Sequence, residues 1–289
     1  MTDSVLGIIG GSGFYDLELE HSRLEEVSGP WGAPSGPLRR GEINGLPVVF
    51  IARHGPGHAI PPTEINYRAN IDALKRAGVT DLVSISACGS FREDLPPGMF
   101  VIVDQFIDRT FAREKSFFGT GCVAHVSVAH PISSGLAARV GDAAKAEAIQ
   151  HHIGGTYLVM EGPQFSTLAE SHMYRAWGCD VIGMTNMPEA KLAREAEICY
   201  SSIAMVTDFD SWHPDHGEVD IPSILAVMGA NSANAARLVT RLAADFPKTH
   251  PDCPDGSDKA LEFAIITPPE ARDPAVMAKL DAVAGRVLG

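Results

Sequence analysis

The sequence predicts an α/β fold in a single domain. Three observations support this prediction: short apolar runs typical of strands recur along the chain, segments with helical spacing separate several of them, and no internal repeat or linker divides the sequence. A chain of 289 residues can bury one sizeable core. Since α/β folds often use about 200 to 250 residues for one domain, we expect one domain over residues 1–289.

Seven runs of β-branched and other apolar residues have the length of buried strands. A strand that is covered on both faces is apolar almost continuously, rather than at every second position. The expected strands are residues 5–9, 46–52, 81–87, 99–103, 156–160, 180–184 and 198–206.

Helical spacing is clearest in residues 64–77, where Ile65, Ala69 and Leu74 can share one face and Gly78 follows the last turn. Thr167 and Glu170 form a capping box that starts a second helix. Further helices are expected at residues 134–150, 188–197, 223–246 and 274–288. Residues 28–36 and 248–258, rich in Gly and Pro, are expected to be surface loops, and the role of residues 248–289 stays open.

Charge and cysteine content exclude several classes of protein. The 23 Lys and Arg against 36 Asp and Glu give a net charge of −13, which disfavours a nucleic-acid partner. No apolar run approaches the ~18 residues of a membrane span. The five cysteines are odd in number and lack a C-x-x-C pair, which argues against a disulfide framework or structural zinc. The N-terminus is too acidic, and its apolar stretch too short, for a secretory signal, so we expect a cytoplasmic protein.

Three of the expected strands end in residues that can bind an anion. The first runs into a glycine turn whose backbone N–H groups and hydroxyl can approach phosphate, the second into a guanidinium and an imidazole, and the third into small and hydroxyl-bearing residues. The carboxyl ends of strands in open α/β sheets form the ligand crevice, so a converging phosphate pocket is expected. The residues concerned are Ser12, Arg53, His54, Ser86 and Ala87.

Each of these signals has a simpler interpretation when taken alone. The glycine turn lacks both the dinucleotide fingerprint and the P-loop pattern, and it could be only a tight turn. Arg53 could form a surface ion pair. A metal site at His54 and His58 is disfavoured because the Gly and Pro residues between them forbid a helix. Cys88 is expected to be a buried thiol rather than a nucleophile.

Two further strand ends offer a surface for a flat ring. Phe165 and Ser166 could place an aromatic face and a hydroxyl over it, and Met184 and Thr185 could place a thioether beside another hydroxyl, although core packing is the alternative for both pairs.

Asp208 and Asp210 follow a buried strand at positions i and i+2, which point to the same side of an extended chain. Burial and mutual repulsion would raise their pKa values, as a general acid requires. A solvated Asx turn is the alternative.

Taken together, these segments closely resemble the trimeric purine nucleoside phosphorylase family, and within it the members that act on methylthioadenosine. The resemblance runs in order from about residue 5 to 245. It rests on the motifs GIIGGSG (7–13), ARHG (52–55), NYRAN (66–70), ACGS (87–90), DQFIDRT (104–110), EGP (161–163), MT (184–185) and TDFD (207–210). It implies a mixed central sheet or distorted barrel flanked by helices.

The resemblance also implies roles for individual residues. Phosphate is expected to bind at Ser12, Arg53, His54, Ser86, Ala87 and Thr185. Met184 resembles the residue under the ribose, Phe165 and Ser166 those of the base pocket, and Asp208 and Asp210 the pair that faces N7 and the 6-amino group. An apolar slot for a thiomethyl group is expected at Ile221, Ile224 and Leu225, with His125 from a neighbouring subunit.

The implied reaction is phosphorolysis of a methylthioadenosine-type nucleoside, with 5′-deoxyadenosine as a further substrate, inorganic phosphate as co-substrate, and no metal or cofactor. Asp208 is the expected general acid. Two carboxylates suit the donating amino group of adenine, whereas relatives that take 6-oxopurines have Asn first and lack the second carboxylate. The alternatives are a 6-oxopurine nucleoside or methylthioinosine phosphorylase, and a non-catalytic nucleoside-binding module. The protein is expected to form a homo-oligomer, specifically a trimer.

Overall fold

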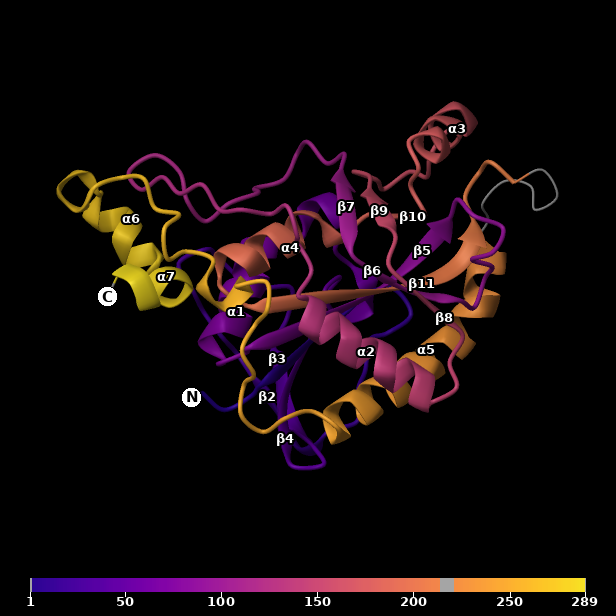
Figure 1. Ribbon diagram of the computed structural model, residues 1–289, viewed down its shortest axis with the longest axis horizontal. Coiled ribbons are helices and arrows are strands. Elements are labelled where there is room, and N and C mark those ends of the chain that lie inside the picture. Colours follow the sequence, from indigo (N-terminus) through magenta and orange to yellow (C-terminus); the bar gives the residue numbers. More distant parts are fainter. Residues whose placement is uncertain (1, 214–220, 289) are drawn as a thin grey trace.

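A mixed β-sheet lies at the centre of the structure, a computed structural model that describes residues 2–213 and 221–288 (Figure 1). In the described residues, eight strands run in the order β2-β3-β4-β1-β5-β10-β9-β7, and β11, β6 and β8 branch from β5. The strands are β1 Leu6–Gly10, β2 Glu20–Glu25, β3 Leu38–Ile43, β4 Leu46–Ala52, β5 Asp81–Ser90, β6 Phe100–Val103, β7 Gln105–Asp108, β8 His151–Ile153, β9 Thr156–Val159, β10 Val181–Gly183 and β11 Cys199–Phe209.

The expected α/β class and mixed sheet are confirmed. The sheet is open rather than closed into a barrel, because the pairings of the described strands do not join its ends. All seven strands expected from apolar runs are present; β4 has the expected bounds, and the other six have shifted ends. Four further strands were missed, and β2 shows why: its residues are mostly exposed and polar, so no apolar run marks it.

Helices cover both faces of the sheet. They are α1 Tyr67–Arg76, α2 Ser134–Ala146, α3 Leu168–Ala176, α4 Asn186–Glu195, α5 Ile221–Ala244, α6 Pro274–Lys279 and α7 Asp281–Leu288. Helices α1, α4 and α7 contribute to one apolar cluster, and α2 and α5 contribute to another. Figure 1 shows α2 beside α5 and, apart from them, α1 near α4.

Strand β4 explains why the strands read as continuous apolar runs. Val48 and Phe50 pack in the cluster under α2 and α5, whereas Val49 and Ile51 pack in the cluster under α1 and α4. Successive side chains point to opposite faces of a sheet. Since helices cover both faces, the consecutive residues 48–51 are all buried and apolar.

The helix boundaries follow local signals closely. Asn66 caps α1 by accepting from the Ala69 N–H, and Thr167 and Glu170 make the expected capping box at α3. The expected helix over residues 274–288 is instead two helices, which meet at Leu280.

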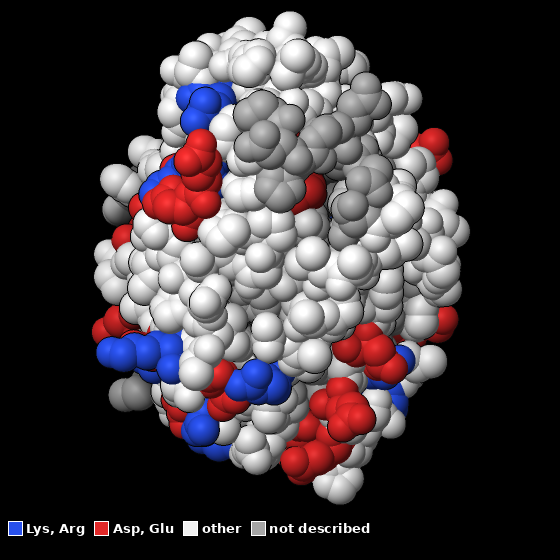
Figure 2. Space-filling view, turned by 90° about the vertical axis from the view of Figure 1, so that its right-hand side faces the viewer, with Lys and Arg blue, Asp and Glu red and all other residues white. Residues whose placement is uncertain are grey.

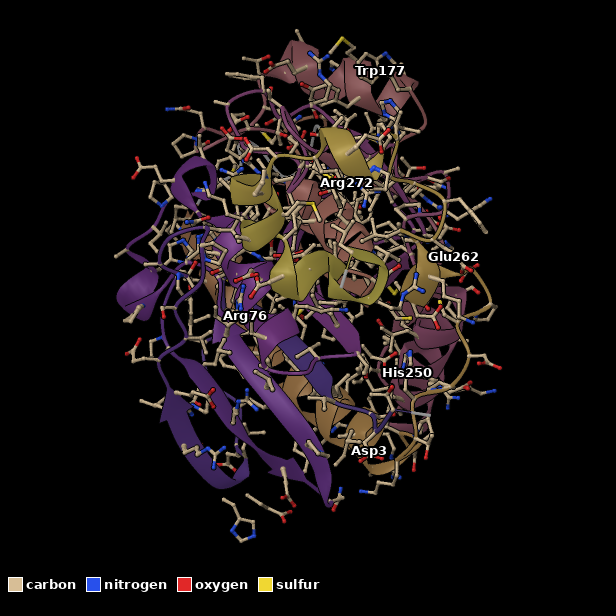
Figure 3. All side chains as sticks on the ribbon, turned by 90° about the vertical axis from the view of Figure 1, so that its left-hand side faces the viewer. Asp3, Arg76, Trp177, His250, Glu262 and Arg272 are labelled. Atoms are coloured by element: carbon tan, nitrogen blue, oxygen red, sulfur yellow. The ribbon has the colours of Figure 1, made fainter. Side chains whose placement is uncertain are left out.

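The C-terminal segment lies against α1. Arg76 pairs with Asp72 of its own helix and with Asp281 of α7, and Arg286 of α7 pairs with the buried Glu197. Figure 3 shows Arg76 beside the two C-terminal helices. Within the described residues, none of the helices has the length and apolar character needed to cross a bilayer.

Candidate active site

A cavity of about 580 Å³ lies at the carboxyl ends of four parallel strands, β1, β4, β5 and β11. Its volume is within the range of small-molecule sites. The start of α5 forms part of its wall. Figure 2 looks onto the side of the molecule where α5 starts; charged side chains gather below and at the upper flank, and a broad uncharged area lies between them. Of the expected site residues, the cavity wall contains Ser12, Arg53, His54, Ser86, Ala87, Phe165, Met184, Thr185, Asp208, Asp210, Ile221, Ile224 and Leu225.

Arg53 directly follows β4, and its side chain is fully buried. Glu189 of α4 accepts from its Nε at 2.7 Å and from its Nη2 at 3.0 Å. Arg53 and Glu189 form a buried ion pair, so the alternative interpretation of Arg53 in a surface ion pair is wrong. The remaining nitrogen, Nη1, lies beside Gly11, where a Cβ atom would be only 2.5 Å away. Glycine at position 11 is therefore needed for the guanidinium to reach the cavity.

His54 is also buried, and its Nδ1 lies 2.8 Å from the carbonyl oxygen of Ile60. Because a carbonyl oxygen can only accept, Nδ1 carries the hydrogen and Nε2 keeps a lone pair. Burial is the main reason that the pKa of His54 falls to about 4, and Arg53 and His58 lower it further. The imidazole is therefore neutral at pH 7. His58 stacks on it with ring centroids 4.1 Å apart.

Hydroxyl groups complete this end of the cavity. Ser86 on β5 lies 3.2 Å from the Tyr157 hydroxyl and donates to Asn186 Oδ1 at 3.1 Å. Thr185 directly precedes α4, and Ser12 lies in the glycine turn after β1. Arg53, Ser12 and Thr185 offer donors suited to an oxyanion, whereas Ser86, whose proton goes to Asn186, can accept from a protonated phosphate oxygen.

Two carboxylate residues from the end of β11 also line the cavity. Asp208 accepts from the Thr207 hydroxyl at 2.6 Å. Asp210 is only 4% exposed, and its Oδ2 has no hydrogen-bond partner among the described residues. Burial is the main cause that raises the pKa of Asp210, and the negative charge of Glu170 adds to it. The expected rise from burial is thus confirmed for Asp210, while the added repulsion comes from Glu170.

Apolar side chains form the rest of the wall. Phe165 and Met184 both contact the cavity, and Phe165 remains 44% exposed. Helix α5 contributes one face at helical spacing: Ile221, Ile224, Leu225 and, one turn further on, Met228. Ile221 and Leu225 are 55% and 60% exposed, so the slot they line is open on one side in the single chain.

Two expected residues lie outside this wall. The Ser166 hydroxyl points to Met160 Sδ at 3.7 Å. His125 is exposed in the segment between β7 and α2, and its N–H donates to the Ala264 carbonyl. The contribution of His125 to the site of a neighbouring subunit stays a prediction.

Two residues that matter for the site, Met228 and Glu189, were not predicted from the sequence. Met228 continues the spacing of Ile221 and Leu225, so helical periodicity could have found it. Glu189 offered no signal, because 136 positions separate it from Arg53.

Cys88 also lines the cavity. Burial, with Asp208 nearby, holds the pKa of the Cys88 thiol well above its usual range, which opposes a nucleophilic role. No cluster of three or more metal-ligating side chains occurs in residues 2–213 and 221–288.

Comparison with known proteins agrees with this geometry. Residues 5–244 match the phosphorylase superfamily. The chain belongs to the phosphorylase superfamily. An S-methyl-5′-thioadenosine phosphorylase from Bradyrhizobium diazoefficiens is 65% identical over 289 residues, which cover 100% of this chain and 99% of the relative.

Solved structures of this superfamily have the same fold. A methylthioadenosine phosphorylase from an antarctic soil metagenomic library has a TM-score of 0.91 and 44% identity, with 98% of this chain and 99% of the other covered. A methylthioadenosine phosphorylase from Schistosoma mansoni in complex with adenine has a TM-score of 0.81 and 36% identity, with 83% and 91% covered.

Proposed function

We propose that this protein catalyses the phosphorolysis of S-methyl-5′-thioadenosine to adenine and 5-methylthioribose 1-phosphate, a reaction that serves purine and methionine salvage. One observation carries the proposal: a single cavity has an oxyanion end built on Arg53 and Ser86 and a carboxylate end built on Asp208 and Asp210. The unpartnered Oδ2 of Asp210 suits the donating 6-amino group of adenine. The names of the relatives support the same activity.

In the proposed mechanism, phosphate at the oxyanion end attacks C1′ of the ribosyl group. The C1′–O bond forms as the C1′–N9 bond breaks, and the electron pair of the broken bond passes to the purine. Asp208 donates a hydrogen bond or a proton to N7, which neutralises the charge on the departing adenine. General acid catalysis of this kind contributes typically ~100- to 10,000-fold.

The proposal assigns the other cavity residues by their chemistry. Ser12, His54, Ala87 and Thr185 surround the phosphate, Met184 lies under the ribose, and Phe165 lies against the base, with Ser166 behind that wall. Ile221, Ile224, Leu225 and Met228 receive the methylthio group, because only an apolar slot suits it. 5′-Deoxyadenosine is proposed as a further substrate, since its smaller 5′ group fits the same slot.

We further propose that the protein is a homo-oligomer, as a trimer, in which His125 of a neighbouring subunit closes the open side of the apolar slot. The exposure of Ile221 and Leu225 supports this. Inorganic phosphate is the proposed co-substrate, and no metal or cofactor is required. The five free thiols favour a reducing, cytoplasmic setting.

A substrate panel with and without phosphate tests the proposal. Adenine release from methylthioadenosine should depend on phosphate concentration, and methylthioinosine and inosine should react far more slowly. Release that is independent of phosphate would indicate a hydrolase, a preference for inosine would indicate a 6-oxopurine enzyme, and binding without release would indicate a nucleoside-binding module.

A further inference from the structure

The guanidinium of Arg53 has almost no freedom in its buried position. Of its five N–H groups, the structure gives four a protein acceptor: two meet the carboxylate of Glu189, one meets Ser84 Oγ, and one from Nη1 meets the Ile85 carbonyl at 3.3 Å. The fifth belongs to Nη1, the nitrogen beside Gly11 and the cavity. Arg53 therefore presents one N–H to a ligand, in a fixed direction.

Glu189 also connects to Ser86, a second residue of the cavity wall that is expected to bind phosphate. The Tyr200 hydroxyl donates to Glu189 Oε1 at 2.9 Å, and Asn186 Nδ2 lies 3.0 Å from that hydroxyl. Asn186 Oδ1 accepts from Ser86 Oγ at 3.1 Å. A buried chain of hydrogen bonds thus joins the two sides of the oxyanion end.

The negative charge of Glu189 determines the direction of every hydrogen bond in this chain. A carboxylate can only accept, so Tyr200 must donate to it and must accept from the Asn186 amide. The amide oxygen of Asn186 is then turned toward Ser86, whose hydroxyl proton it accepts. A neutral amide at position 189 would remove this constraint.

We infer that Glu189, which does not line the cavity, is a positioning residue for phosphate: it holds Arg53 with one N–H toward the anion. Through Tyr200 and Asn186 it also fixes the hydroxyl proton of Ser86, so that Ser86 Oγ can accept a hydrogen bond from the P–OH group of the anion. This inference rests on the proposed function. A guanidinium on a long side chain must otherwise lose its rotational freedom when the ligand binds, which weakens affinity.

Two variants test this role. Glu189→Gln introduces an amide that cannot accept from both Arg53 donors, so we expect the KM for phosphate to rise about tenfold or more. Tyr200→Phe keeps the charges of Arg53 and Glu189 but removes the hydroxyl that bonds to both Glu189 and Asn186, so we expect a phosphate KM raised by about threefold. In both variants the KM for methylthioadenosine should stay within about twofold of the wild type.

Glu195→Gln is the matched control. Glu195 lies on the same helix and is also buried, but it accepts from Ser116 and the Phe117 N–H instead of Arg53. Its phosphate KM should equal that of the wild type. Thermal unfolding verifies that each variant is folded, and calorimetric titration with inorganic phosphate measures binding without turnover.

The outcomes separate this inference from the proposed function. A wild type without phosphate-dependent activity would contradict the function itself. An active wild type beside a folded Glu189→Gln whose phosphate KM is unchanged or lower would overturn the positioning role, since removal of a negative charge alone favours anion binding. If Glu189→Gln does not fold, Tyr200→Phe decides, and an unchanged phosphate KM in that variant overturns it as well.

Discussion

Asp208 Oδ2 lies 3.2 Å from the point where a Cβ atom on Gly89 would stand, and the Cβ of Asp210 lies 3.4 Å from the same point. Both carboxylate residues therefore face the space that Gly89 leaves open on β5. The neighbouring strands β5 and β11 together make the carboxylate end of the cavity, with the shift in strand register between Val206 and Asp208 at its edge.

The first prediction concerns the general acid. Asp208→Asn should lower kcat for phosphorolysis of methylthioadenosine by at least about 100-fold, because the amide cannot deliver a proton to N7. Adenine release at saturating phosphate measures the effect. Asp245→Asn, an exposed position just after α5, should leave kcat unchanged. A turnover of Asp208→Asn near that of the wild type would remove Asp208 from the mechanism.

The second prediction concerns the choice of base. Asp210→Asn replaces an acceptor by a group that can also donate, so the preference for adenine over hypoxanthine nucleosides should fall by about tenfold or more. The ratio of kcat/KM for methylthioadenosine and methylthioinosine is the measurement. A ratio that stays at the wild-type value would mean that Asp210 does not read the 6-position.

The third prediction concerns the 5′ slot. Leu225→Ser should raise the KM for methylthioadenosine by about tenfold through lost apolar contact, with a much smaller effect on adenosine. Leu24→Ser is a suitable control, since Leu24 is similarly exposed (66%) but lies on β2. Equal effects on both nucleosides would show that Leu225 does not contact the 5′ group.

The fourth prediction concerns stability and pH. The pKa of His54 is about 4 in the folded protein against an ordinary 6.5, so the unfolded chain binds more protons between these values. The contribution of His54 is complete above pH 6.5 and is lost as the pH falls toward 4, by up to about 3 kcal/mol. Urea unfolding of the wild type and His54→Gln measures it. Parallel curves for the two proteins from pH 7 to 5 would refute the prediction.

The fifth prediction concerns the glycine turn. Gly11→Ala should destabilise the fold by about 1 to 3 kcal/mol and weaken phosphate binding, because its Cβ would meet Arg53 Nη1 at 2.5 Å and the Ile85 carbonyl at 2.7 Å. Gly285→Ala, in α7 with nothing within 4 Å, should not destabilise. Chemical denaturation and phosphate KM values distinguish the two variants. Wild-type stability and phosphate KM in Gly11→Ala would contradict the close approach.

Local patterns predicted much of the fold and of the cavity wall. The capping box at Thr167 and the apolar run at residues 46–52 are properties of neighbouring residues, and so was the placement of Arg53 directly after a strand. Ser86 was expected at a strand end but lies inside β5, which continues to Ser90. Contacts between segments that are far apart in the sequence leave no local pattern, so they could not be predicted. The polar edge strand β2 was missed for this reason, because pairing with β3 rather than its own side chains defines it.

The sequence alone determined which chemical groups stand at the ends of the strands, because strand ends and helix caps depend on residues a few positions apart. Only the tertiary structure decided what each group can do there. Glu189 holds Arg53 across 136 positions, Asp210 is buried with a free acceptor, and Ser166 turns toward Met160. Burial and contacts between distant residues determine the pKa of each side chain and the direction of its hydrogen bonds. Both depend on tertiary packing, so the sequence alone does not predict them.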